Sequence, residues 1–308
     1  MAFTSKDVMA LREKTGVGMM DCKKALQESD GDMEKAIDYL REKGLAKQAK
    51  KASRVAAEGM AYAVADIDKK VGVVVEVNSE TDFAAKSDKF IEFVQQVAQI
   101  IMDQAPADVE ALMACDAGNG QTLADVLRDK VMVIGENLSV RRFVRYEGDC
   151  VAYVHGGGRI GVLVKFEADA AASGSDALVE CGKDVAMQIA ALNAPYLDEA
   201  SVPADVVAHE KEVQLALMKN DPKNANKPEN ILEKMITGKM RKYFEEVCLI
   251  NQAFVKDGNL TVGQYVEQQA KAAGGAMTLA SFVRYEKGEG LQKREDDFAS
   301  EVASMMGN

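Results

Sequence analysis

Beyond residue 55 the chain contains two copies of one sequence unit, and this repeat constrains the fold more than any other feature. The apolar run Gly72–Val77 returns as Gly161–Phe166, an offset of 89 residues (161 − 72). Phe143–Glu147 returns unchanged as Phe282–Glu286, an offset of 139 residues (282 − 143). Shorter matches pair Ala61–Val64 with Ala152–Val154 and Thr122 with Thr261. Each copy reads as strand, turn, strand, helix, further helix and strand. The chain is therefore predicted to be of the α+β class, with two small antiparallel sheets that each carry helices.

The two offsets differ by 50 residues (139 − 89), so the second copy contains an insertion of about that size. Apolar residues at helical spacing form one stripe over 206–218 and another over 231–244, and a tip rich in Pro and Asn, Asp221–Pro228, lies between them. This pattern predicts an antiparallel helical hairpin, or coiled coil. Such a hairpin either acts as an interaction arm or packs on itself, and the sequence leaves both open.

The first 54 residues predict a small module of three short helices. Apolar residues at helical spacing mark helices over 6–14, 20–26 and 33–40, and Gly44 is predicted to end the third. Residues 41–54, which hold six basic residues and one acidic residue, are interpreted as a solvated linker. Met19 and Met20 follow an apolar loop; they either fold back into the small core or form an apolar contact patch.

The segment Asn78–Lys86 joins an apolar strand, Val71–Val77, to a strongly periodic helix. Ser79 and Asp82 have the spacing of a capping box, which favours a plain helix cap. The same segment places an aromatic residue, Phe83, beside a carboxylate. That pair is also suited to a probe, an acid plus a wedge presented to the metal or nucleotide site of a partner. Local chemistry does not decide between the two interpretations.

Composition excludes several classes of protein. The net charge of −11 argues against nucleic acid as the main ligand, because phosphate binding needs a cationic surface. The five cysteines include no C-x-x-C pair, which excludes a disulfide framework or a zinc knuckle and suits a reducing cytosol. The N-terminus has no signal-peptide pattern and no apolar run is of membrane-spanning length, so we expect a soluble, cytoplasmic protein.

The sequence offers little material for an active site. It has only two histidines, and His155–Gly158 resembles the oxyanion-hole loop of some esterases. That chemistry needs a Gly-x-Ser-x-Gly nucleophile elbow, which the chain lacks. The three glycines are better explained as a hairpin turn between strands. Walker A, dinucleotide-binding and H-E-x-x-H motifs are also missing, so the sequence indicates a binding protein and not an enzyme.

Three motifs carry a resemblance to a known family. Thr15–Leu26, Thr81–Lys86 and His155–Gly161 resemble the signature of bacterial elongation factor Ts, and the match extends over essentially the whole chain. The resemblance implies a guanine-nucleotide exchange factor that binds the GDP form of elongation factor Tu, the GTPase that delivers aminoacyl-tRNA to ribosomes. The alternative is a helical adaptor that binds partners without any effect on nucleotide.

The resemblance also implies roles for particular residues. Four residues would bind the partner and dislocate its Mg²⁺, with Phe83 as the wedge: Thr81, Asp82, Phe83 and Ala84. Further partner contacts would come from Arg12, Met19, Met20, Ile134, Gly135 and His155. No residue would be catalytic or a metal ligand. The protein would need no cofactor of its own, because it acts on the GDP and Mg²⁺ of its partner.

The domain organisation implied by the resemblance has five parts. They are a ubiquitin-associated-like three-helix domain with a basic linker (1–54), core subdomain N (55–147), core subdomain C (148–200 and 247–286), the inserted hairpin (201–246) and a C-terminal module (287–308). The last part carries an amphipathic pattern predicted to be a helix, which either folds back on the core or docks on a partner. No direct contact with nucleic acid or membrane is expected. Whether the hairpin joins two copies of the complex into a dimer stays open.

Overall fold

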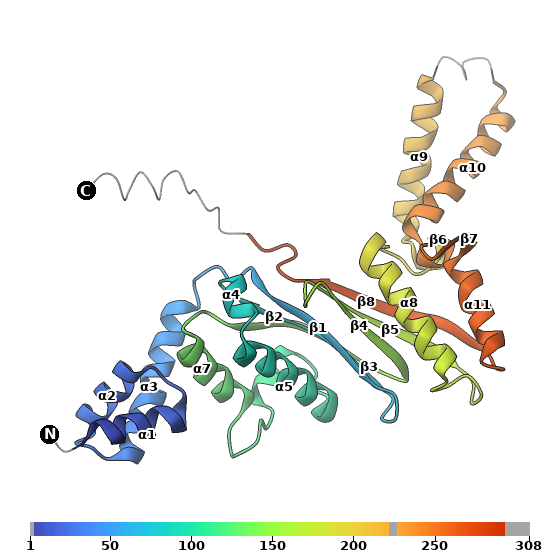
Figure 1. Cartoon of the computed structure of the whole chain (residues 1–308). Coiled ribbons are helices and arrows are strands. Elements are labelled where there is room, and N and C mark those ends of the chain that lie inside the picture. Colours follow the sequence, from blue (N-terminus) through green and yellow to red (C-terminus); the bar gives the residue numbers. More distant parts are fainter. Residues whose placement is uncertain (1–2, 222–226, 293–308) are drawn as a thin grey trace.

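The protein combines helices with small antiparallel sheets, as the α+β prediction requires (Figure 1). The structure is a computed structural model that describes residues 3–221 and 227–292. The predicted C-terminal helix and most of the predicted hairpin tip lie outside the described residues. The division into five domains stays a prediction, and the elements are described here in chain order.

The first sheet has the order β1-β2-β3 and is antiparallel throughout. Its strands are β1 (Glu58–Asp66), β2 (Val71–Ser79) and β3 (Ser139–Glu147). Between β2 and β3 the chain forms α4 (Asp82–Ala85), α5 (Asp88–Gln104), α6 (Val109–Ala114) and α7 (Leu123–Ile134). Alternate valines of β2, including Val73 and Val75, pack against apolar residues of α5 and α7, including Phe93, Val97 and Val131. This cluster is the core of the first copy.

The second sheet has the order β4-β5-β8 and is also antiparallel. Its strands are β4 (Asp149–His155), β5 (Ile160–Ala168) and β8 (Met277–Glu286). Two helices, α8 (Asp176–Leu192) and α11 (Val262–Ala272), cover its outer face and form the second core. Short elements complete this copy: the 3-10 turns η1 (Glu199–Ser201) and η3 (Leu249–Asn251) and the two-stranded ribbon of β6 (Ala253–Phe254) and β7 (Asp257–Thr261).

The repeat predicted from the sequence extends to strand register. Val75 pairs with Phe143 in the first sheet, and Val164 pairs with Phe282 in the second, at the two offsets found in the sequence. A register shift falls between Glu76 and Val77 in one copy and between Lys165 and Phe166 in the other, which are equivalent positions. Thr122 and Thr261 both cap a helix through a capping box.

One proposed match between the copies is out of register by two residues. Ala63 pairs with Val74 and Ala152 pairs with Leu163, which makes Ala63 and Ala152 equivalent. The sequence comparison had matched Ala152 with Ala61. A shift of two residues keeps each side chain on the same face of the strand, so the sequence pattern alone does not reveal the error.

The inner faces of the two sheets pack directly on each other, in a cluster that includes Ala63, Val74, Cys150 and Leu163. Equivalent glycines permit the close approach. A Cβ on Gly72 would lie 2.6 Å from Leu163 Cδ1, and a Cβ on Gly161 would lie 3.0 Å from the backbone carbonyl of Ala61. Each sheet thus presents a glycine where the other sheet comes closest, and the whole core is a stack of helices, sheet, sheet and helices.

The predicted insertion forms the two helices α9 (Ala204–Asn220) and α10 (Glu229–Val247), which contact each other and project away from the sheets (Figure 1). Met218 of α9 and Met240 of α10 are buried. In chain order, the hairpin lies between α8 and α11 of the second copy, where the first copy has the short α6 between α5 and α7.

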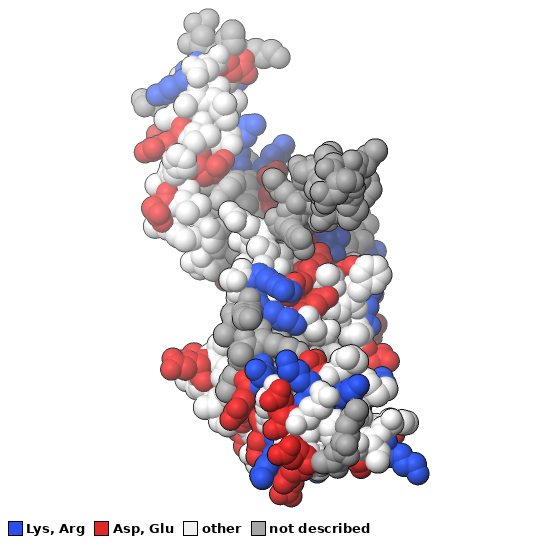
Figure 2. Space-filling view, turned by 90° about the vertical axis from the view of Figure 1, so that its left-hand side faces the viewer, with Lys and Arg blue, Asp and Glu red and all other residues white. Residues whose placement is uncertain are grey.

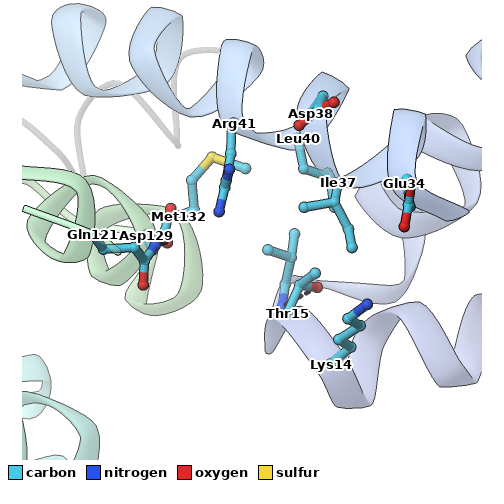
Figure 3. A pocket seen from close by; sticks show the side chains of 11 residues that line it. Lys14, Thr15, Glu34, Ile37, Asp38, Leu40, Arg41, Gln121, Asp129 and Met132 are labelled. Atoms are coloured by element: carbon cyan, nitrogen blue, oxygen red, sulfur yellow. Dashed lines mark hydrogen bonds between the residues drawn. The ribbon is translucent and has the colours of Figure 1, made fainter. Parts of the chain in front are cut away.

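The N-terminal module contains α1 (Ser5–Thr15), α2 (Met19–Glu28) and α3 (Met33–Lys51), and here one prediction is wrong. Gly44 does not end the third helix, which continues to Lys51, so most of the predicted linker is helical. The reason is packing: a Cβ on Gly44 would lie 3.2 Å from Arg128 Cγ and 3.3 Å from Met132 Cγ of α7. The glycine lets α3 lie close against the core. A cleft of about 530 Å³ beside this contact is lined by Arg41 and Met132, among others (Figure 3).

We expect Gly161→Ala to destabilise the protein by about 1–3 kcal/mol, because the added methyl group meets backbone of the opposite sheet, which cannot move aside. Gly238→Ala is the matched control, since Gly238 lies exposed in α10 with no atom near its absent Cβ. The control substitution should stabilise the helix by about 1 kcal/mol. Urea titrations followed by circular dichroism measure both effects. Equal midpoints for the two variants would contradict the close packing of the sheets.

Candidate functional site

The turn between β2 and α5 exposes the most accessible large hydrophobic side chain that the structure describes. Phe83 has 82% of its surface exposed, whereas the adjacent Ala84 and Ala85 are buried. The helix α4 is only four residues long, so it turns its two alanines inward and leaves the phenyl ring with nothing to pack on. An isolated exposed phenylalanine on a rigid turn is suited to insertion into a partner.

The cap of this turn is Thr81 and not Ser79, so the predicted capping box is wrong. Thr81 Oγ1 accepts a hydrogen bond from the backbone N–H of Ala84 at 3.2 Å. Ser79 is fully buried as the last residue of β2, and its hydroxyl donates to the carbonyl of Thr81. The strand runs two residues further than its apolar letters indicate, which moves the cap along the chain. A second cap, Ser87, starts α5.

A carboxylate that the sequence reasoning missed supports the turn. Glu136 accepts hydrogen bonds from the backbone N–H groups of Glu80 (3.1 Å) and Thr81 (3.0 Å) and from the Thr81 hydroxyl (2.6 Å). Glu80 returns the contact, because its carboxylate accepts from the N–H of Asn137 at 2.6 Å. These hydrogen bonds hold together two loops that are about 55 residues apart in sequence. The only sequence signal was that Glu136 follows the predicted contact residues Ile134 and Gly135.

Asp82 is the charged member of the site. Its carboxylate lies 2.6 Å from the ammonium of Lys86, and this hydrogen bond keeps the pKa of Asp82 below its usual value. The group is half-exposed and therefore presents an ionised carboxylate to the solvent at neutral pH, directly beside Phe83.

Ile134 and Gly135 end α7 next to the turn. Gly135 is exposed, with the positive φ of 88° that suits a glycine at a helix C-terminus. Lys51 of α3 donates a hydrogen bond to its carbonyl. Ile134 is half-buried and packs on the first core, so it anchors the loop as well as facing outward.

The two methionines of the N-terminal module lie on the surface, which decides between the two interpretations left open by the sequence. Met19 is 44% exposed and Met20 is 75% exposed at the start of α2, so they form a patch and not part of the small core. Arg12 is exposed nearby and lines one shallow cleft together with Met19 and Lys89 of α5. Lys89 lies in the first turn of α5, so this cleft lies beside the start of α5.

His155 is exposed at the end of β4, and the three glycines after it form the predicted turn, with φ values of 58°, 64° and 94°. The carbonyl of Gly158 accepts a hydrogen bond from the N–H of Ala61 in β1. Ala61 pairs with Glu76 near the end of β2, so the turn lies at the end of the first sheet that leads to Thr81. The Tyr153 hydroxyl lies 3.0 Å from His155 Nδ1 and orients the ring.

Charged side chains of both signs lie around the site. Lys and Arg are interspersed with Asp and Glu over the face shown in Figure 2. In the described part of the chain, no group of three or more His, Cys, Asp or Glu side chains could hold a metal ion. Over the same residues, no helix is long and apolar enough to cross a membrane.

Comparisons with known proteins agree over nearly the full length. The family model described as elongation factor TS matches residues 80–289. Similar proteins named elongation factor Ts come from Clostridioides difficile strain 630 (49% identity, 98% of each chain covered) and from Clostridium perfringens strain 13 (47% identity, 99% of each chain). A third, from Trichlorobacter lovleyi, is 47% identical over 100% of this chain and 99% of its own. The chain therefore belongs to the elongation factor Ts family of translation elongation factors.

Proposed function

We propose that the protein binds the GDP form of elongation factor Tu and promotes GDP release, which allows GTP to reload. The observation that carries this proposal is Phe83, exposed on a turn that Glu136 holds in place and flanked by an ionised carboxylate. Membership of the elongation factor Ts family supplies the identity of the partner. The protein forms no covalent bond and uses no cofactor of its own.

In this mechanism Phe83 enters the GTPase domain of the partner as a wedge, and the segment Thr81–Ala84 disturbs the Mg²⁺ site. Mg²⁺ demands near-ideal octahedral geometry and bridges nucleotide phosphates, so a small displacement of its ligands is costly. Asp82 adds an anionic oxygen close to a cation that prefers oxygen ligands. The remaining contacts are assigned to the residues that the resemblance implies, Arg12, Met19, Met20, Ile134, Gly135 and His155.

The energetics follow from linkage. If the factor weakens GDP binding by some ratio, GDP weakens the binding of the factor by the same ratio. The wedge must therefore gain its free energy in the complex that has lost nucleotide. A rigid turn serves this purpose, because little conformational entropy is lost when a side chain binds in a conformation that it already holds. The hydrogen bonds from Glu80 and Thr81 to Glu136 provide that rigidity.

We expect Phe83→Ala to slow GDP release about tenfold or more, because truncating a central buried anchor commonly costs ~2 kcal/mol in a complex. Stopped-flow release of a fluorescent GDP from elongation factor Tu, with and without the chain, measures this. Val255→Ala is the matched control, since Val255 is 51% exposed near the β6–β7 ribbon, on the other copy. Binding without any acceleration of release by the unmodified chain would favour the adaptor interpretation instead.

We expect Glu136→Ala to reduce exchange several-fold while leaving Phe83 itself unchanged, because the turn loses the acceptor of three hydrogen bonds. Its effect should nearly vanish in a Phe83→Ala background, since both changes act through the same wedge. Glu110→Ala, at an exposed glutamate of α6, is the control. A full additional loss in the double variant would show that Glu136 acts in some other way.

A further inference from the structure

The end of the second copy reaches into the first copy beside the candidate site. Lys287, the first residue after β8, donates its backbone N–H to the carbonyl of Arg159 at 2.9 Å. The next N–H, that of Gly288, donates to the buried carboxylate of Glu76 in β2 at 2.8 Å. A Cβ on Gly288 would clash with the backbone carbonyl of Ala57, so this connection is closely packed. The position of Lys287 is therefore fixed by backbone contacts.

The shared fold does not require a lysine at this position. The repeat makes Gly148 the equivalent of Lys287, at the offset of 139 residues (287 − 148). The N–H of Gly148 donates to the carbonyl of Lys70 at 2.8 Å. Lys70 is the equivalent of Arg159, at the offset of 89 residues (159 − 70), so the same backbone hydrogen bond occurs in both copies. The ammonium group is present only in the second copy, so the repeated frame does not explain it.

The ammonium group of Lys287 forms an ion pair with the carboxylate of Glu58. Glu58 starts β1 and pairs with Ser79, the last residue of β2, so it lies at the base of the turn that carries Phe83. The two side chains are only 25% and 35% exposed, so the pair is mostly shielded from solvent. Lys287 therefore neutralises a carboxylate at the base of the candidate site.

The ion pair within the turn is held more loosely. Lys86 lies 2.6 Å from Asp82, but its side chain is 75% exposed, and an exposed pair of this kind is favoured by a factor of about five at most. The pKa of Lys86 is raised chiefly by its hydrogen bond to Asp82 and by the charge of Asp82, with a further contribution from the charge of Glu58. Lys86 therefore lies in the field of two carboxylates.

We propose that Lys287 is a positioning residue for Asp82. By pairing with Glu58, it leaves Lys86 free to hold Asp82. Without Lys287, Glu58 would have no ion-pair partner among the described residues. Its side chain is less exposed than that of Asp82, 35% against 46%, so its carboxylate would gain more from a cation and would compete for Lys86. Asp82 would then lose the contact that holds it beside Phe83.

The inference rests on the proposed function, in which Asp82 acts at the Mg²⁺ site of the partner. It adds that the second copy takes part in the site, through a side chain that the first copy lacks. The wedge turn is thus supported from two sides, by Glu136 through the backbone and by Lys287 through charge.

Carbon-13 NMR titration of the Asp82 carboxyl group in the free chain tests the inference without partner or nucleotide. The pKa of Asp82 lies below its usual value, chiefly because of the hydrogen bond from Lys86, with smaller contributions from the charges of Lys86 and Lys287. Lys287→Met should raise this pKa towards the usual value. Lys287→Arg should leave it unchanged, because arginine keeps the charge that pairs with Glu58. Lys271→Met, at an exposed lysine of α11, is the matched control.

Two double variants identify the route. Glu58→Gln removes the competing charge, so in the Lys287→Met background it should return the pKa of Asp82 to its low value. Damage to the loop would not be corrected by that change. In a Lys86→Met background, Lys287→Met should add only a small rise, because Asp82 then has no ammonium group to lose. The proposal is wrong if Lys287→Met causes no rise, if Glu58→Gln does not rescue it, or if the rise is as large in the Lys86→Met background.

Stopped-flow release of fluorescent GDP from elongation factor Tu connects the charges to exchange. Lys287→Met should slow release about threefold, which is the order of magnitude of one exposed ion pair, and should have no effect in an Asp82→Asn background. A raised pKa of Asp82 with unchanged release would overturn the positioning role. If the unmodified chain did not accelerate release, the proposed function would fail, while the NMR titration would still decide how Lys287 acts on Asp82. Circular dichroism confirms that each variant folds.

Discussion

The face-to-face contact between the two sheets is the interaction on which the rest of the structure depends. Each sheet has only three strands and would expose one apolar face if it stood alone. The equivalent glycines Gly72 and Gly161 let the two inner faces come together. Glu76 of β2 adds a polar connection, because it accepts a hydrogen bond from the N–H of Gly288, beyond β8. Burial raises the pKa of Glu76, but hydrogen bonds from the Gly288 N–H, Asn78 and Arg142 outweigh it, so the pKa lies below its ordinary value. The carboxylate is thus kept ionised inside the protein, where it connects β2 to the chain beyond β8.

The repeat supplies the frame, and the differences between its copies supply the candidate site. In the first copy β2 ends in a turn that exposes Phe83. In the second copy β5 ends at Ala168, and the following residue, Asp169, is exposed and accepts hydrogen bonds from the N–H groups of Ala171, Ala172 and Ala276. The same strand therefore leads to an outward probe in one copy and to a closed turn in the other. The second copy gained the projecting pair α9 and α10 instead.

Much of this fold was predictable from the sequence, because periodicity and repetition are local or regular signals. The strands, the two copies, the helical hairpin and the glycine turn after His155 all follow from them. The errors arose where distant packing overrides a local signal. Gly44 looks like a helix stop, but it is a contact glycine, because α7 lies against it. Ser79 looks like a cap, but it is buried at the end of β2, so Thr81 caps instead. Glu136 had no sequence signal beyond its position after Gly135, since its partners lie about 55 residues away and only the folded chain brings them together.

The exposure of Phe83 is itself informative about energy. A phenyl ring left in water contributes nothing to folding, whereas burying it would stabilise a protein by roughly 1.5–3 kcal/mol. The chain holds the ring outside and supports the turn with a charged acceptor, so that free energy is available only when a partner supplies the pocket. Because Glu136 fixes the turn before any partner binds, little of this free energy is lost in ordering the segment. In the proposed mechanism, the free energy that Phe83 gains in a nucleotide-free complex appears, by linkage, as weaker binding of GDP. The hydrogen bonds that fix Thr81 and the exposure of Phe83 to solvent therefore both serve the proposed insertion of Phe83 into a partner.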